Sequence, residues 1–127
     1  KEIKKLILLS RNCLNPNGKI IIFTLITSKN EIPTFFKMKK KLNKSLKRDQ
    51  KILRLLSHLY PRSIFKIFSY KVKISRDEYI EMVKNRYIST LLNLRNSEIL
   101  KGIDEIKNKY KERLNFKDKL ICLILKK

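Results

Sequence analysis

Two short runs of apolar residues constrain the fold of this chain more than any other feature. The first, at about 19–26, is rich in β-branched residues and does not alternate with polar ones. The second, at about 119–126, is also unbroken and far too short to span a membrane. Strands that are covered on both faces have this pattern, because neither face needs polar side chains. We therefore expect two buried strands.

A third strand is expected at about 65–74, where apolar and polar residues alternate. The alternation predicts that one set of side chains points inward, and lysines occupy the outward positions. The inward set is Phe68, Tyr70, Val72 and Ile74. Because lysines oppose pairing with another chain, we expect this strand at an edge of the sheet.

Two helical patterns flank the first strand. Apolar residues recur at helical spacing from Ile3 to Leu14 and stop at the turn cluster Asn15-Pro16-Asn17-Gly18. Further along, leucines between Leu42 and Leu59 fall near one face of a helix that must end by Pro61. This helix belongs to a first cap-like segment, expected at about 31–60.

A second cap-like helical segment is expected at about 76–114. Ser75 and Glu78 have the spacing of a capping box, in which each side chain accepts a hydrogen bond from a backbone N–H, so a helix should begin at Arg76. A second helix should begin near Asn96. Gly102 lies inside it, and intrinsic propensity alone disfavours glycine there by about 1 kcal/mol relative to alanine.

The net charge of +21 favours a polyanionic partner, because each phosphate that a cation neutralises releases counterions. However, 24 of the 32 basic residues are lysine, and they accompany 18 isoleucines and 10 asparagines. All three are encoded by A/T-rich codons, so genome composition explains much of the charge. Base recognition also favours arginine over scattered lysine.

Neither a metal site nor a targeting segment is indicated. Cys13 and Cys122 lie far apart in apolar stretches and are expected as small core residues, and His58 is the one histidine. No run has the length of a membrane span, and 1–14 has no signal-peptide pattern. We therefore expect a cytoplasmic protein, and because 1–14 already reads as the middle of a helix, a fragment of a longer one.

Several motifs, taken in order, resemble the end of a known enzyme family. The turn before the first strand matches a Leu-x-Pro-x-Gly pattern at Leu14, Pro16 and Gly18. The later motifs are Ser75-Arg76-Asp77-Glu78-Tyr79, Asn85-Arg86-Tyr87-Ile88-Ser89, Gly102-Ile103-Asp104-Glu105-Ile106 and Phe116-Lys117-Asp118. Together they resemble the C-terminal region of class I, S-adenosylmethionine-dependent methyltransferases of the trans-aconitate-methyltransferase-like branch, which methylate small molecules, often carboxylates.

This resemblance implies an α/β fold: the last three strands of a Rossmann-like seven-stranded sheet, with a helical cap. The final strand would be antiparallel and inserted between the other two. The half of the domain that binds S-adenosylmethionine would be missing, and the glycine count agrees, because a chain with two glycines has no Gly-rich loop. Residues 1–127 would then be a partial domain, inactive alone.

Four residues are candidates for binding the methyl acceptor under this resemblance. If the acceptor is a carboxylate, a cation must hold it, and Arg86 with Tyr87 is the favoured pair, with Tyr70 and Arg76 as neighbours. The alternative for Arg86 is a solvated charge at a helix end. No catalytic, cofactor-binding or metal-binding residue is assigned, because methyl transfer from a sulfonium mainly requires alignment.

Two further expectations concern partners. The first strand would lack its parallel neighbour, so the chain is expected to self-associate through that sheet edge. A different class of function also stays open at this point: a small basic protein that binds nucleic acid and is complete in itself.

Overall fold

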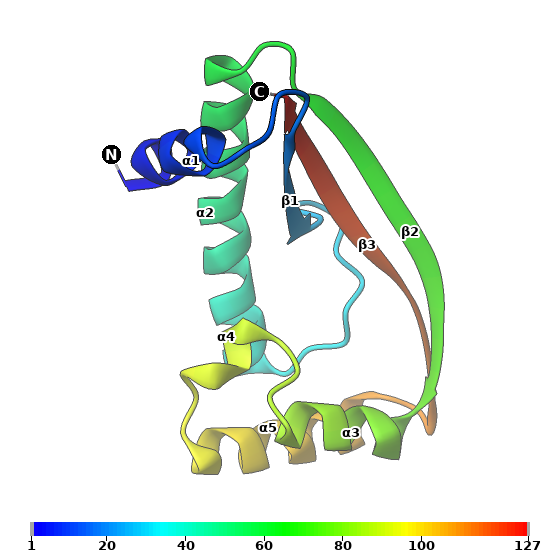
Figure 1. Cartoon of the computed structure of the whole chain (residues 1–127). Helices are drawn as coiled ribbons and strands as arrows, with labels where there is room; N and C mark the ends of the chain where they lie inside the picture. The colour runs from blue at the N-terminus through cyan, green and yellow to red at the C-terminus, as the bar shows by residue number, and fades with distance from the viewer. Residues whose placement is uncertain (1, 127) are drawn as a thin grey trace.

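A computed structural model describes residues 2–126 (Figure 1). Its elements, in chain order, are α1 (Glu2–Asn12), β1 (Lys19–Leu25), α2 (Phe36–Leu59), β2 (Ile64–Ser75), α3 (Arg76–Lys84), α4 (Ser89–Leu92), α5 (Asn96–Lys109) and β3 (Arg113–Lys126). The chain is therefore α/β, as expected. Within this described part, no helix is both long and apolar enough to cross a membrane.

The three strands form one sheet in the order β1-β3-β2. β3 pairs antiparallel with both neighbours, and Cys122 lies opposite Phe23 of β1 and Lys66 of β2. The predicted insertion of the final strand and the predicted edge position of β2 are confirmed. β3 begins at Arg113, however, so the helical segment expected to reach residue 114 ends at Lys109.

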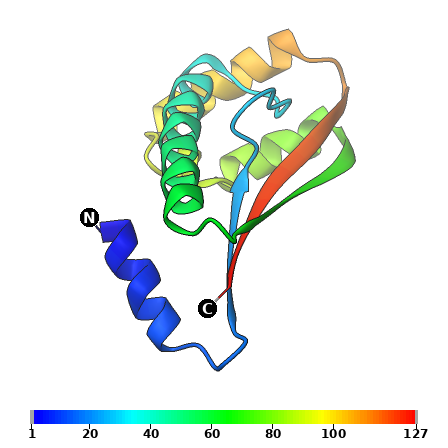
Figure 2. The same ribbon diagram turned by 90° about the horizontal axis from the view of Figure 1, so that it is seen from above.

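Helices α1 and α2 cover one face of the β1–β3 pair, and both lie on the same side of it (Figure 2). Their contact is a cluster in which Ile7 of α1 and Leu56 of α2 meet Leu123 and Leu125 of β3. Leu123 pairs with Ile22 of β1, and paired residues share a face of the sheet. This cluster therefore anchors both helices to the central strand.

Helices α3 and α5 pack against the other end of the sheet. Their cluster includes Tyr79 of α3 and Ile103 of α5, and Leu114 and Phe116 of β3 pack into it. The start of α2 joins the same cluster through Met38, which is fully buried. The long strand β3 thus connects two hydrophobic clusters, one at each end.

Between these clusters, one face of the sheet carries exposed apolar side chains. We call it the open face; its exposed residues are Ile21, Phe23, Ile64, Phe68 and Tyr70. The inward positions expected for Phe68 and Tyr70 are therefore wrong, since these side chains are 46% and 51% exposed. Helices reach this face near Ile74. On the opposite face, Phe65 and Ile67 are also exposed, so the first part of β2 is covered on neither face.

Strand β1 is covered less than its sequence predicts. Ile21 and Phe23 are more than half exposed, while Ile20 and Ile22 pack against the α1–α2 cluster. The outer edge of β1 also faces no other strand among residues 2–126. Self-association through this edge stays a prediction.

The two predicted helix starts are confirmed, whereas the prediction for the cysteines holds for one of the two. The capping box is confirmed, because the Ser75 hydroxyl accepts the Glu78 N–H while the Glu78 carboxylate accepts from the Ser75 N–H. The start of α5 at Asn96 is also confirmed. Cys122 is buried as expected, but Cys13 is exposed because it follows the end of α1 at a turn.

Gly102 gives a test of the contact between α5 and the residue before α2. A Cβ atom at Gly102 would lie 2.5 Å from two ring carbons of Phe35, whose side chain is 1% exposed. We expect Gly102→Ala to lower the free energy of unfolding by about 1–2 kcal/mol, because overpacking outweighs the better helix propensity of alanine. Urea unfolding measures the change.

A double-mutant cycle provides the control for Gly102. In a Phe35→Leu background the ring is gone, so Gly102→Ala should be neutral or stabilising there. Equal destabilisation in both backgrounds would show that the Phe35 ring is not the cause.

Candidate functional site

A cleft lies where the carboxyl end of β1 meets α2 and α4. It has an inner cavity of about 310 Å³ and an outer one of about 590 Å³, which share Ser45, Arg48, Ser89 and Thr90. We call the two together the α2–α4 cleft.

The inner cavity has apolar side chains beside a polar floor, and the outer cavity is cationic. Apolar residues of the inner cavity come from β1, α2 and the segment before α4: Phe23, Leu25, Leu42, Leu46 and Ile88. The outer cavity is lined by Lys41, Lys44, Arg48 and neutral hydrogen-bonding groups. A ligand with an anionic group and an apolar body would match this division.

The spacing of residues along α2 explains why its cations gather at the cleft. Lys41, Lys44, Ser45 and Arg48 are separated by three or four residues and so lie on one side of the helix. Leu42 and Leu46 are buried beneath them, which fixes the rotation of α2 relative to the sheet.

Hydrogen bonds hold the floor of the cleft. Thr24 of β1 donates its hydroxyl hydrogen to Asp49 Oδ2, with 3.2 Å between the oxygens. Arg48 Nε donates to the other oxygen of Asp49 at 3.0 Å, and Arg48 Nη2 donates to the Ser45 hydroxyl at 3.1 Å. Asp49 therefore offsets the charge of Arg48 and orients its guanidinium.

Lys41 and Lys44 supply positive charge to the outer cavity. Lys41 Nζ donates to the carbonyl oxygen of Asn93 at 2.9 Å, which positions the ammonium without neutralising it. Within residues 2–126, no carboxylate lies within ion-pair distance of Lys41 or Lys44. The cleft therefore suits an anion, whose charge these two cations would balance.

The sequence prediction missed this cleft as a site. It assigned residues 31–60 to a cap-like segment and named no site residue there. The available signal was the spacing Lys41-x-x-Lys44-Ser45-x-x-Arg48. Nothing in the sequence indicates that Thr24 and Asp49, 25 residues apart, are hydrogen bonded.

Arg86, the favoured acceptor-binding residue, is engaged with backbone groups. Its Nη1 donates to the carbonyl oxygens of Leu91 and Leu94, the second at 2.7 Å. Its Nη2 donates to Asn96 Oδ1 at 2.8 Å. The guanidinium thus joins the end of α3 to α4 and to the start of α5.

Arg76 has a similar structural environment at another place. Its Nη1 donates to the carbonyl oxygens of Lys107 and Tyr110, each at 3.1 Å. A cation beside the last carbonyls of α5 also interacts favourably with the helix dipole. Arg76 thus supports the end of α5, whereas Arg86 supports α4 and the start of α5.

The two candidate tyrosines both lie near Asp118. Tyr70 donates its hydroxyl hydrogen to Asp118 Oδ2 at 2.7 Å, and this bond raises the pKa of Tyr70. Burial raises the pKa of Tyr87 to about 12, and the negative charge of Asp118 also raises it. Because Asp118 would repel a carboxylate, this arrangement does not favour an acidic ligand.

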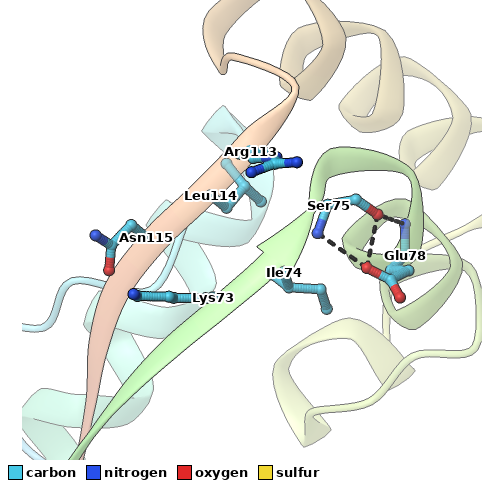
Figure 3. Close-up of a pocket in the computed structure, with 7 residues that line it drawn as sticks. All are labelled: Lys73, Ile74, Ser75, Glu78, Arg113, Leu114 and Asn115. Atoms are coloured by element: carbon cyan, nitrogen blue, oxygen red, sulfur yellow. Dashed lines mark hydrogen bonds between the residues drawn. The ribbon is translucent and has the colours of Figure 1, made fainter.

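A separate hollow of about 500 Å³ lies at the end of β2 and β3. Figure 3 shows its lining, including Ser75 and Glu78, whose polar atoms face each other within the capping box. These hydrogen bonds lower the pKa of Glu78. The carboxylate is thus committed to the start of α3, so this hollow is weaker than the cleft as a candidate site.

Comparisons with known proteins assign no family. Neither the models of known protein families nor the sequences of curated proteins match this chain. Within residues 2–126, no three side chains of histidine, cysteine, aspartate or glutamate gather as metal ligands would.

The contacts of Arg86 give a testable consequence. We expect Arg86→Ala to lower the free energy of unfolding by about 2 kcal/mol, because charged hydrogen bonds to the carbonyls of Leu91 and Leu94 are lost. The matched control is Arg95→Ala, since the Arg95 side chain is 83% exposed and should contribute less than about 0.5 kcal/mol. Equal effects in urea unfolding would contradict the structural role.

The raised pKa of Tyr87 predicts that the stability of the fold depends on pH. Its pKa is about 12 in the folded chain and about 10 when unfolded, so the unfolded chain loses the proton first. The contribution of the protonated Tyr87 hydroxyl to the free energy of unfolding is therefore complete below pH 10. It falls by roughly 2 kcal/mol in total as the pH rises to about 12. Stability measured from pH 9 to 12 should fall less steeply in Tyr87→Phe than in the native chain, and parallel curves would contradict this.

Proposed function

We propose that this chain is the C-terminal part of a class I, S-adenosylmethionine-dependent methyltransferase domain, and that its α2–α4 cleft holds the methyl acceptor. The observation that carries the proposal is the strand order β1-β3-β2 with the last strand antiparallel to both neighbours. The resemblance of the sequence to that family implies this order. A right-handed parallel α/β sheet alone would not place the final strand in this way.

The bare parts of the sheet support the same proposal. The outer edge of β1 and the exposed apolar residues of the open face are surfaces that other elements normally cover. In a complete methyltransferase sheet, a parallel strand would pair with β1 and helices would cover the open face. Self-association of the isolated chain would hide the same surfaces.

The residues of this chain do not form a site for the cofactor by themselves. Gly102 packs against the Phe35 ring inside α5, and Gly18 lies over Leu14 in the turn before β1. Neither is part of a Gly-rich loop at which backbone N–H groups could approach a nucleoside closely. The proposal therefore assigns cofactor binding to the other half of the domain.

The role of this chain would be to bind and orient the acceptor. Methyl transfer from a sulfonium needs alignment more than acid–base catalysis. Lys41 and Lys44 would hold an anionic group of the acceptor, such as a carboxylate, and the apolar side chains of the inner cavity would contact its carbon skeleton. On this view the acceptor-binding cations lie on α2, and Arg86 supports the cap.

The test combines genetics with calorimetry. The coding sequence immediately upstream should specify a strand followed by an acidic, Gly-x-Gly-containing loop. The longer protein should bind S-adenosylmethionine with a micromolar dissociation constant, while residues 1–127 alone should give no measurable heat. The short chain, checked for folding by circular dichroism, is the control.

Two results would reject the proposal. One is an upstream reading frame without such a loop. The other is micromolar binding of S-adenosylmethionine by residues 1–127 alone, since these residues offer no glycine-rich loop for it.

A further inference from the structure

Among the helices, α2 carries the most positive charge. α2 carries nine basic residues and one acidic residue, Asp49. By contrast, α3 and α5 together carry five basic and six acidic residues. Lysine-rich codon usage acts on all helices alike, so it does not account for this difference. The charge of α2 therefore calls for a functional explanation.

The cations of α2 form a stripe that is long enough for a chain-like ligand. Lys41 and Arg48 are seven residues apart, which corresponds to about 10 Å along the helix axis. Lys37 and Lys51 extend the same side by about one turn at each end, and Lys37 is paired with Glu98 at 3.6 Å. Such a stripe can contact several phosphates of one strand.

Neutral hydrogen-bond donors stand beside this stripe. The hydroxyls of Ser45, Ser89 and Thr90 and the carboxamide of Asn93 line the same outer cavity as Lys41 and Lys44. Phosphate oxygens accept hydrogen bonds from hydroxyl and amide groups as well as from cations. The cavity thus offers both kinds of contact to a phosphate.

Two exposed aromatic rings lie next to the cleft. Phe23 lines the inner cavity, is 58% exposed, and has its ring centroid 6.0 Å from that of Phe68 on the open face. Exposed rings beside a cationic groove are the arrangement on which unpaired bases stack, without preference for sequence. Bases within a duplex are already stacked and cannot use these rings in this way.

We infer that the α2–α4 cleft and the adjoining rings bind single-stranded nucleic acid, with phosphates on the α2 stripe and bases on Phe23 and Phe68. Base-specific contacts are not required, so the predominance of lysine over arginine does not oppose this binding mode. The inference rests on the placement of charge and aromatic rings, not on methyl transfer. It can therefore hold or fail independently of the proposed function.

The experiment measures fluorescence anisotropy of a labelled oligothymidylate of about 16 nucleotides at about 150 mM salt. We expect micromolar binding by residues 1–127, weaker binding to a duplex of the same length, and weaker binding to inorganic polyphosphate of matched charge. Lys41→Gln/Lys44→Gln should lower the affinity about tenfold and reduce the slope of log affinity against log salt by about 1.4, as expected for two lost phosphate contacts.

Matched variants separate this site from general charge attraction. Lys101→Gln/Lys107→Gln removes the same charge from the exposed surface of α5 and should change the affinity less than about twofold. Phe23→Ser should lower the affinity for oligothymidylate at least about fivefold, with no change for polyphosphate, because only bases stack.

Four results would overturn the inference. They are the absence of oligothymidylate binding at this salt, equal losses in the α2 and α5 lysine variants, tighter binding to the duplex than to the single strand, and tighter binding to phosphatidylserine vesicles than to the oligonucleotide. Binding of S-adenosylmethionine by the longer protein is a separate measurement, so failure of one proposal is distinguishable from failure of the other.

Discussion

The pairing of β3 with both neighbouring strands is the interaction on which the rest of this structure depends. β1 and β2 make no direct ladder with each other, so both owe their backbone hydrogen bonds to β3. The same strand supplies Leu123 and Leu125 to the cluster under α1 and α2, and Leu114 to the cluster under α3 and α5. Backbone pairing therefore brings segments from the start, middle and end of the chain together through its last strand.

This arrangement explains why the cleft forms where it does. The two hydrophobic clusters attach to opposite ends of β3, and α2 runs from one to the other, with Met38 in the first and Leu56 in the second. Its middle part therefore passes the carboxyl end of β1, where Asp49 accepts the hydrogen bond from Thr24. The fold places the basic side of α2 beside an exposed strand end.

Features encoded within a few residues were predictable from the sequence, whereas features that depend on distant partners were not. The capping box and the edge position of β2 follow from local patterns and are confirmed. The inserted last strand, which the resemblance implied, is confirmed as well. Alternation along β2 placed Phe68 and Tyr70 on the same face as Ile74, which packs into the α3–α5 cluster, but it could not show that the helices leave Phe68 and Tyr70 uncovered. Likewise, the cationic spacing on α2 is local, but its position beside Thr24 arises only in the assembled fold.

The charge balance inside the cleft bears on both proposals. Asp49 offsets the charge of Arg48 at the floor of the cleft, so the inner cavity has little net charge beside its apolar side chains. In the outer cavity, Lys41 and Lys44 have no carboxylate within ion-pair distance in the described part of the chain. A small anionic acceptor would place its charge outside and its carbon skeleton inside. A single strand would follow the outer cations along α2 and use the inner cavity only through Phe23. The two ligands thus share the lysines but differ in their need for the apolar wall formed by Leu42, Leu46 and Ile88.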